Sequence, residues 1–480
     1  MQNRRTSAEK PANGVFREAC LRGAKAVNVL LVTLPFLGCW LAYYAPRVAV
    51  AVSPLRSACV VALFVLLFCF FGRTYDAFLL SVRRPGELLV SQLLSILMTD
   101  AFLFIVLWLM NGGFPNLLPA LLALSGQLLL SAVWCRLAHA WHKSRFAGQK
   151  TAVIYDQKSS ADELLDREGL GGMFSVQVQC TAEECLKKEM RPLEGMDAAI
   201  LCGIHSHERN RILKYCVAHG ICAYVAPRIG DLLMSGARRT HLCHRPLLRV
   251  ESYSPSPEFL FFKRLFDVAA SAAAILLTSP LMLGVAIAIR AQDGGPVLYR
   301  QTRLTRGGRP FSILKFRSMR TDAEKDGVAR LCSGENDDRI TPVGRFIRAC
   351  RLDELPQLFN ILGGSMSVVG PRPERPEIAR QYERQIPEFS LRLQAKAGLT
   401  GYAQVYGKYN TDPYDKLQMD LMYMAKPSLL EDLRIIFATV KILFVSESTE
   451  GIQAGQTTAM HEEAAQDASD GGEKHDRNIA

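Results

Sequence analysis

The 480-residue chain lacks several signatures that would place it in a familiar class of protein at once. Its thirteen cysteines include no CxxC pair, which argues against zinc ribbons and thioredoxin-like redox sites, so we interpret them as reduced packing residues. Two short histidine pairs, at positions 205 and 207 and at positions 241 and 244, have no second pair at ligand spacing. We therefore expect local structural roles for these histidines.

Two further absences narrow the class. No GxGxxG follows the first expected soluble strand, where YDQKSSAD stands instead, so we do not expect dinucleotide binding. No small-residue cleavage site follows the first apolar segment, so we do not expect a cleaved signal peptide. The net charge is +11, but long apolar runs have no place in an ordinary nucleic-acid binder. The basic charge instead predicts contact with anionic lipid head groups and phosphate substrates, and no nucleic-acid partner.

Four apolar segments, at residues 26–45, 57–71, 88–109 and 117–137, are long enough, or nearly so, to cross a bilayer. Basic residues precede the first segment, lie in the second connection and follow the fourth segment, whereas the third connection, NGGFPN, carries no charge. By the positive-inside rule both ends of this region are cytoplasmic. We predict a cytoplasmic N-terminus over 1–25 and a four-helix transmembrane bundle over 26–140.

A fifth apolar segment, residues 266–290, contains Ser279 and Pro280 near its middle and has basic residues at both ends. Proline removes a helical hydrogen bond and bends the chain, and the serine hydroxyl could satisfy a carbonyl that the bend frees. A helix that breaks here and returns to the same membrane face keeps both basic clusters in the cytoplasm. We predict such a re-entrant helix; a proline-kinked transmembrane helix is the alternative.

The middle of the chain reads as a soluble module. TAVIYD, DAAILCGI and ICAYVAP predict short buried strands, so residues 149–250 are expected to form a small, parallel, Rossmann-like α/β module. A regulatory or oligomerisation role fits such a module, which makes a homo-oligomer one of the expected partners. Residues 251–258 read as a linker. The tail over 447–480, with eight acidic and two basic residues, predicts disorder. The expected fold class is an α+β membrane protein.

The most informative segment is RACRLDELPQLFNILGGSMSVVGPRP, residues 348–373. It sets adjacent carboxylates among arginines; the residues are Asp353, Glu354, Arg348, Arg351 and Arg372. If the acidic pair lies on a helix, its side chains point about 100° apart and cannot share one task. One carboxylate could attack phosphorus while the other binds a hard cation such as Mg²⁺. The alternative is an exposed acidic pair on an amphipathic helix.

Basic and glycine-rich segments surround this pair. PFSILKFRSMR predicts a strand that ends in Lys315 and Arg317, and the Gly370, Pro371 and Pro373 positions predict a rigid turn that presents Arg372. KAGLTGYAQVYGKYN carries Lys408 and glycines whose backbone could approach a ligand closely. Near the C-terminus, residues 427–444 predict an amphipathic helix with Leu429, Leu433, Ile436, Phe437 and Val440 on its apolar face.

Six strings, namely FKRLFD, TSPLM, KFRSM, RLDELPQLFNIL, MSVVGPRP and GLTGYAQVYGKYN, resemble the bacterial sugar transferases in their order and spacing. These are monotopic polyprenyl-phosphate phosphoglycosyltransferases. The resemblance is to the long form with an N-terminal membrane bundle, of the undecaprenyl-phosphate hexose phosphotransferase type. It implies a catalytic domain over 259–446, with a re-entrant membrane helix, on the cytoplasmic face of the bacterial inner membrane.

The resemblance also implies a reaction. Asp353 would attack the sugar-bearing phosphorus of a UDP-sugar, a UDP-hexose in the long form, and undecaprenyl phosphate would then accept the phospho-sugar. This step starts exopolysaccharide, capsule or O-antigen synthesis. Glu354 would help to hold Mg²⁺, and Lys315 and Arg348 would face phosphate groups. Lys408 stands where the better-studied small members carry arginine. A non-catalytic membrane scaffold or regulator of a polysaccharide assembly complex is the rival hypothesis, against which the intact acidic pair argues.

Overall fold

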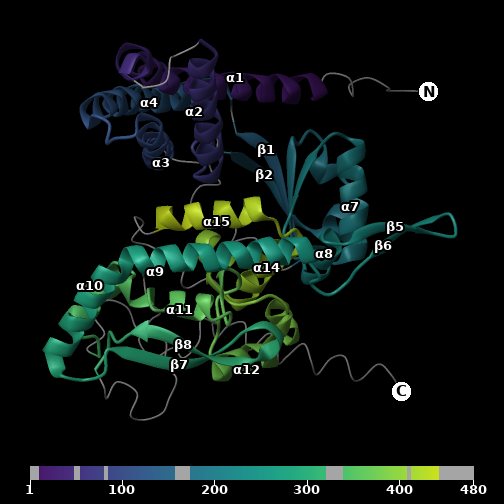
Figure 1. Ribbon diagram of the computed structural model, residues 1–480. Coiled ribbons are helices and arrows are strands. Elements are labelled where there is room, and N and C mark those ends of the chain that lie inside the picture. The colour runs from purple at the N-terminus through teal and green to yellow at the C-terminus, as the bar shows by residue number, and fades with distance from the viewer. Residues whose placement is uncertain are drawn as a thin grey trace. The chain divides into compact units, whose positions relative to one another are not determined.

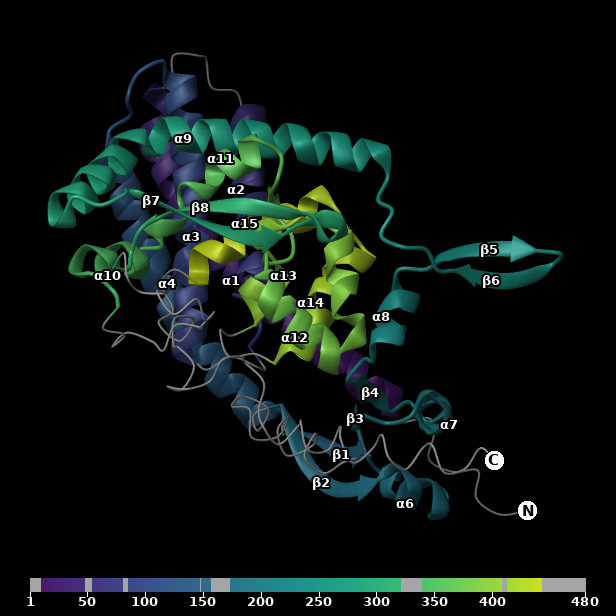
Figure 2. The ribbon, with the colours of Figure 1, turned by 90° about the horizontal axis from the view of Figure 1, so that it is seen from below.

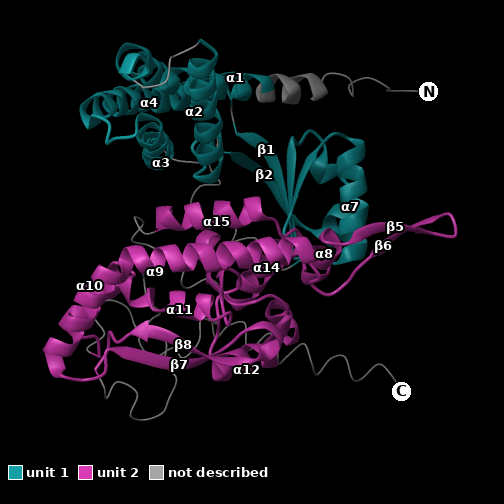
Figure 3. Ribbon diagram, viewed as in Figure 1, with its two compact units in different colours: residues 1–226 teal, residues 227–480 magenta. Residues whose placement is uncertain are grey.

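The computed structural model describes residues 10–47, 54–80, 85–146, 148–156, 173–320, 339–407 and 412–442. The chain divides into two compact units, residues 1–226 and 227–480, coloured separately in Figure 3. Lys408 and the acidic tail, both singled out above, lie outside the described residues.

The N-terminal unit begins with four long helices (Figure 1). They are α1 (Lys10–Cys39, continued by a π-helical turn over Trp40–Tyr44 and a 3₁₀ turn over Ala45–Arg47), α2 (Pro54–Thr74), α3 (Pro85–Asn111) and α4 (Leu117–Arg145). Each is long and apolar enough to cross a membrane. The four apolar segments are therefore confirmed as helices, which extend beyond the predicted segments at one end or both.

These helices pack through aromatic side chains. The rings of Phe36 and Phe64 stack with centroids 4.5 Å apart, and Phe68 continues the stack. The outward faces are also apolar, since Leu30, Leu66 and other leucines are exposed. A helix that is hydrophobic all round suits a surrounding of lipid tails better than water, so the region suggests a membrane protein.

A parallel sheet completes the N-terminal unit. Its strands are β1 (Gln149–Tyr155), β2 (Phe174–Thr181), β3 (Ala198–Cys202) and β4 (Cys222–Val225), in the order β2-β1-β3-β4. The helices α6 (Ala182–Lys187) and α7 (Ser206–Ala218) follow β2 and β3. The three predicted strands and their parallel pairing are confirmed. β2, which pairs with β1, was not predicted.

The C-terminal unit contains one very long helix, α9 (Pro257–Asp293). Before it come α8 (Ile229–Ser235) and a hairpin of β5 (Arg238–Leu242) and β6 (Arg245–Arg249). After it come the antiparallel strands β7 (Leu298–Leu304) and β8 (Pro310–Phe316), then α10 (Pro342–Ala349), α11 (Gln357–Leu362), β9 (Ser367–Val369), α12 (Pro376–Gln385), β10 (Gly398–Thr400), α13 (Tyr402–Tyr406), α14 (Pro413–Ala425) and α15 (Leu429–Ile442). Figure 2 shows α9 along one side of this unit.

The backbone of α9 stays helical through Pro280, so the predicted break is a bend within one continuous helix. Figures 1 and 2 both show the helix axis changing direction in its second half. The Ser279 hydroxyl donates a hydrogen bond of 2.8 Å to the carbonyl of Leu276. That carbonyl is four residues before Pro280 and has no helical N–H to accept. The serine hydroxyl therefore satisfies the carbonyl that Pro280 leaves free.

Charged residues at the start of α9 fasten it to the rest of the unit. Lys263 pairs with Asp432 of α15 at 2.6 Å, and both side chains are almost fully buried. Arg264 donates to the last carbonyls of α11, and Asp267 accepts a hydrogen bond of 2.9 Å from the backbone N–H of Val368 in β9. The FKRLFD string thus connects α9 to three separate elements.

Candidate active site

The acidic pair lies on a tight turn and not on a longer helix. Helix α10 ends before Arg351, which adopts a left-handed conformation with φ of 55°. Glycine usually occupies such a position, and another residue there costs about 1–2 kcal/mol. A 3₁₀ turn, Leu352–Glu354, follows at once. Successive residues of a 3₁₀ turn are about 120° apart, so the two carboxylates point in different directions.

Glu354 is held by cations. Its Oε1 lies 2.8 Å from Lys315 Nζ at the end of β8 and 3.8 Å from Arg372 Nη2, and its side chain is only 17% exposed. Burial alone would raise the pKa of this carboxyl, but the charges of Lys315 and Arg372 outweigh burial and lower the pKa to about 2. Glu354 is therefore a fixed carboxylate.

Asp353 is held much less tightly. No hydrogen bond or ion pair fixes its carboxylate among the residues that the structure describes. Burial and the neighbouring charge of Glu354 raise its pKa, against the opposing pull of Lys315, Arg348 and Arg351. One carboxylate of the pair is thus immobilised, and the other is left available within the same field of positive charge.

The predicted cations do not all face this pair. Lys315 and Arg372 contact Glu354, and Arg348 and Arg351 act on Asp353 through their charge. The Arg317 guanidinium is instead buried against the Asp293 carboxylate at the end of α9. Its predicted phosphate contact would require that ion pair to be exchanged for a ligand.

Sequence reasoning gave no role to Asn360, which joins α11 to β8. Its side chain accepts a hydrogen bond of 2.9 Å from the N–H of Leu314 and donates one of 2.8 Å to the carbonyl of Ser312. The amide thus bonds to the edge of β8 as a further strand would. Asn360 therefore ties α11, which follows the acidic pair in the chain, to the strand that carries Lys315.

Residues 370–374, called here the PRP turn, present Arg372 as predicted. The N–H of Gly370 donates to the carbonyl of Thr400, and the N–H of Gly398 donates to the carbonyl of Pro371, each over 2.9 Å. A Cβ on Gly370 would lie 2.2 Å from the Lys396 carbonyl oxygen. The glycines of this region therefore allow two backbones of the protein to meet, whereas the sequence predicted a close approach to a ligand.

The site can be tested for its fit to Mg²⁺. Among the described residues, both cationic contacts of Glu354 fall on Oε1, which leaves Oε2 for another cation. No group of three or more His, Cys, Asp or Glu side chains placed to hold a metal ion occurs in the described ranges. Mg²⁺ commonly binds through one or two carboxylates and completes its shell with water and substrate phosphates. The acidic pair fits an ion of that kind and not one enclosed entirely by protein.

Comparison with known proteins assigns the family. Residues 259–446 match the family described as bacterial sugar transferase. A UDP-glucose:undecaprenyl-phosphate glucose-1-phosphate transferase of Caulobacter vibrioides is 44% identical over 191 residues, which are 39% of this chain and 71% of that protein. The chain belongs to the bacterial sugar transferase family.

Other members of the bacterial sugar transferase family extend the comparison. The exopolysaccharide production protein PSS of Rhizobium leguminosarum is 42% identical over 201 residues, which are 40% of this chain and 98% of that protein. A UDP-N-acetylgalactosamine-undecaprenyl-phosphate N-acetylgalactosaminephosphotransferase of Aeromonas hydrophila is 39% identical over 239 residues, which are 49% of this chain. The matched part spans about half of the Aeromonas protein, 55% of its length.

Proposed function

We propose that the chain is a phosphoglycosyltransferase that moves a sugar 1-phosphate from a UDP-hexose to undecaprenyl phosphate. The observation that carries this proposal is the difference within the acidic pair: Glu354 is fixed by Lys315 and Arg372, while Asp353 has no such partner among the described residues. A nucleophile must be free to move onto phosphorus, and its surroundings must be fixed. The names of the relatives describe the same class of reaction.

In the first step, a carboxylate oxygen of Asp353 attacks the phosphorus that bears the sugar. A new aspartyl O–P bond forms as the bond from that phosphorus to the bridging oxygen breaks. Uridine monophosphate leaves with the bonding electrons, and a sugar-phosphoryl aspartate remains. No proton has to move for this displacement to balance.

In the second step, a phosphate oxygen of undecaprenyl phosphate attacks the same phosphorus. The O–P bond to Asp353 breaks, the carboxylate is restored, and undecaprenyl diphosphate sugar is released. Two successive displacements let one site serve a water-soluble donor and a lipid acceptor in turn.

Catalysis of both steps depends on positioning and on neutralising charge. Lys315, Arg348 and Arg372 would contact phosphate oxygens, and Arg351, Arg317 and Lys408 are further candidates for such contacts. Glu354 would hold a Mg²⁺ ion, which when bound would neutralise charge on the donor diphosphate.

The same proposal includes a location. The acceptor is a lipid phosphate, and α9 is apolar enough to enter a membrane. We propose that α9 enters and leaves on the cytoplasmic side of the inner membrane, because nucleotide sugars are made in the cytoplasm. The bend at Pro280, with its carbonyl satisfied by Ser279, supports a helix that turns back within lipid.

The test uses the purified full chain in lipid nanodiscs with Mg²⁺, undecaprenyl phosphate and a panel of UDP-sugars. Release of uridine monophosphate is expected with one donor and should be lost in Asp353→Asn. Glu354→Gln should lower the rate by about 10²–10³-fold, since it removes a group that organises transition-state charge. Glu377→Gln, at an exposed carboxylate of α12, is the matched control and should keep full activity.

A second measurement identifies the nucleophile. With acceptor withheld, donor labelled in the sugar phosphate should leave its label on the protein, at Asp353. Normal turnover in Asp353→Asn, or a label mapped to another residue, would exclude the proposed nucleophile. A protein that binds UDP-sugars but never releases uridine monophosphate would instead favour the scaffold hypothesis.

A further inference from the structure

The backbone of the PRP turn is bound by arginine side chains as well as by the glycine contacts described above. The carbonyl of Arg372 accepts a hydrogen bond of 3.0 Å from Arg392 Nη2, and the carbonyl of Pro373 accepts one of 3.2 Å from Arg303 Nη1. One backbone group of each residue from Gly370 to Pro373 therefore has a hydrogen-bond partner. The backbone that carries Arg372 is held in place before any ligand binds.

Arg392 has the largest share in this arrangement. It lies in a 3₁₀ segment, Pro387–Gln394, and its side chain is only 3% exposed. Its guanidinium lies 2.8 Å from an Asp420 carboxylate oxygen in α14 and 3.5 Å from Glu374 Oε1, at the end of the PRP turn. The ring of Phe389 covers its flat face, with 4.9 Å from Cζ to the ring centroid. Arg392 therefore links the PRP turn to α14.

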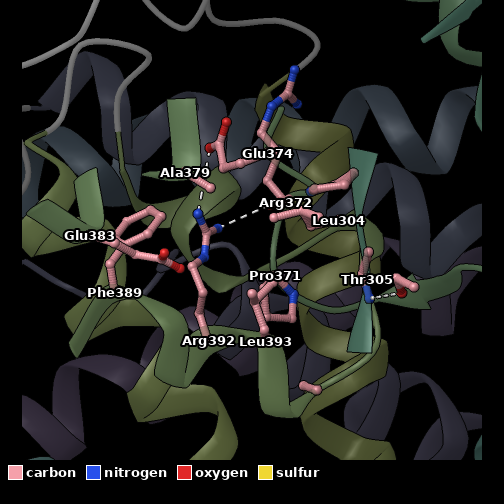
Figure 4. Close-up of a pocket in the computed structure, with 13 residues that line it drawn as sticks. Leu304, Thr305, Pro371, Arg372, Glu374, Ala379, Glu383, Phe389, Arg392 and Leu393 are labelled. Atoms are coloured by element: carbon pink, nitrogen blue, oxygen red, sulfur yellow. Dashed lines mark hydrogen bonds and ion pairs between the residues drawn. The ribbon is translucent and has the colours of Figure 1, made fainter. Parts of the chain in front are cut away.

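Figure 4 shows the geometry of this link. The Arg392 guanidinium lies between the Glu374 carboxylate and the backbone of Arg372, while the Arg372 side chain extends away from it. That side chain is 40% exposed, and its Nη2 lies 3.8 Å from Glu354 Oε1. Arg392 thus binds the backbone of Arg372, whereas the side chain of Arg372 is the part that lies near the acidic pair.

The chemistry of arginine suits this task. A buried guanidinium is costly unless its N–H groups are paired, and its planar fork fixes the direction of several bonds at once. Arg392 and Arg303 also lower the pKa of Glu374, although burial alone would raise it, so the carboxylate stays charged and keeps its hold on the guanidinium. Lysine at 392 would keep the charge but would lack the planar fork that reaches the Glu374 carboxylate and the Arg372 carbonyl from two different nitrogens.

We propose that Arg392, supported by Asp420 and Glu374, is a positioning residue that sets the Arg372 guanidinium beside the acidic pair, so that Arg372 meets the diphosphate of the nucleotide sugar without first being ordered. This inference rests on the proposed function, because it gives Arg372 a phosphate ligand. Arg372 would then be preorganised: a cation that is already in place loses less conformational entropy when the anion binds.

The test is a double-mutant cycle in the full chain, in nanodiscs, with the UDP-sugar that the donor panel selects. Arg392→Gln is expected to lower kcat/KM for the donor by about 100-fold, as misplaced catalytic groups do. In an Arg372→Ala background the same change should cost less than about threefold, because the group that it positions is gone. Arg392→Lys should give an intermediate loss.

The control is Arg434→Gln, which removes a partly buried ion pair with Glu431 on α15, away from the turn. It should leave kcat/KM unchanged in both backgrounds. Hydrogen exchange supplies a readout without turnover. Arg392→Gln should speed exchange of the Gly370 and Gly398 amides, which are hydrogen-bonded at the turn, while the amides of α9 keep their protection.

Equal losses from Arg392→Gln in both backgrounds would show a general structural role and overturn the inference, even with the proposed function intact. If wild-type protein forms no product, the proposed function fails. The cycle is then measured on calorimetric affinity for UDP-glucose, the donor in the name of the Caulobacter relative. Additive effects, or no binding by wild type, would overturn the inference as well.

Discussion

The interior of the α/β module and the interior of the C-terminal unit differ in the kinds of side chain that they bury. The sheet of the N-terminal unit is packed with apolar side chains and cysteines, including Ile154, Leu201 and Cys216. The C-terminal unit buries paired charges in addition to its apolar core, among them Lys263 with Asp432 and Arg392 with Asp420.

This difference has a physical meaning. Apolar burial stabilises a fold without directing any one atom, whereas a buried ion pair is costly unless its geometry is correct. Charges inside the C-terminal unit therefore add little net stability but restrict the positions of α9, the PRP turn and the acidic pair. We infer that apolar burial mainly stabilises the N-terminal sheet, whereas the buried ion pairs of the C-terminal unit mainly fix the relative positions of its elements.

The largest effect is expected when one member of a buried ion pair is removed. Asp432→Ala leaves the Lys263 ammonium buried without its partner and should destabilise the C-terminal unit by about 3–5 kcal/mol. Replacing the whole group at once, as Lys263→Met, Tyr423→Phe and Asp432→Leu, should restore most of that loss, because Tyr423 also donates to Asp432. Urea-dependent proteolysis in detergent measures both variants.

The matched change in the sheet is Ile154→Ala, at a fully buried position. It should cost about 2–5 kcal/mol through lost burial and a cavity. Ile154 has no charged partner, so no second substitution can offset this loss in the way that the triple change offsets the loss at Asp432. A triple variant as unstable as Asp432→Ala would contradict the view that these charges serve geometry.

A second prediction concerns Asn360. Asn360→Ala removes the partners of the Leu314 N–H and the Ser312 carbonyl, at about 1–3 kcal/mol for each group left unpaired. Activity should fall together with the exchange protection of the Leu314 amide. Asn360→Asp keeps an acceptor for Leu314 and should protect that amide better. Full activity in Asn360→Ala would show that α11 is positioned by apolar packing alone.

A third prediction uses pH. Burial, helped by the charge of Glu374 and opposed by Arg392 and Lys416, raises the pKa of Asp420 to about 6 in the folded chain. The folded state then binds this proton more readily than the unfolded state, so stability from this group rises as pH falls from 7 to 4, by on the order of 2 kcal/mol. Relative to wild type, Asp420→Asn should therefore lose about 2 kcal/mol more stability at pH 4 than at pH 7, as measured by thermal unfolding. An identical dependence in both proteins would show that Asp420 titrates normally.

The smallest expected effect is at the bend of α9. Ser279→Ala leaves the Leu276 carbonyl without its donor and should cost about 0.5–1.5 kcal/mol. Thr278→Val is the control, because the Thr278 hydroxyl donates to the Ala274 carbonyl, which the helix N–H of Thr278 can also reach. Equal melting temperatures for Ser279→Ala and wild type would remove the hydroxyl from the account of the bend.

The comparison also explains what the sequence could predict. The four long helices, β1, β3, β4 and β8 follow from runs and alternation of apolar residues, which report burial directly. β2, FSVQVQCT, also alternates apolar and polar residues, as a half-buried strand at a sheet edge does, so its pattern was a usable signal that the prediction left out. The acidic pair and most of its arginines were identifiable because they lie close together in the chain.

Positions set by distant charges could not be predicted. The pattern of α15 predicted an apolar face with Leu429 and Leu433, whereas the residues that the structure buries are Asp432, Ile435 and Ala438, and Asp432 is paired there with Lys263. Arg317 likewise pairs with Asp293, which no local spacing indicates. An ion pair between segments far apart in sequence leaves no periodic trace in either of them.

The contact between the PRP turn and β10 has a consequence for engineering. Gly370, Gly398 and Gly401 meet backbone to backbone, and a methyl group added to any of them would collide with main-chain atoms that cannot rotate aside. Trimming a neighbouring side chain cannot relieve such a clash. A chimera that replaces either loop must therefore keep glycine at these three positions.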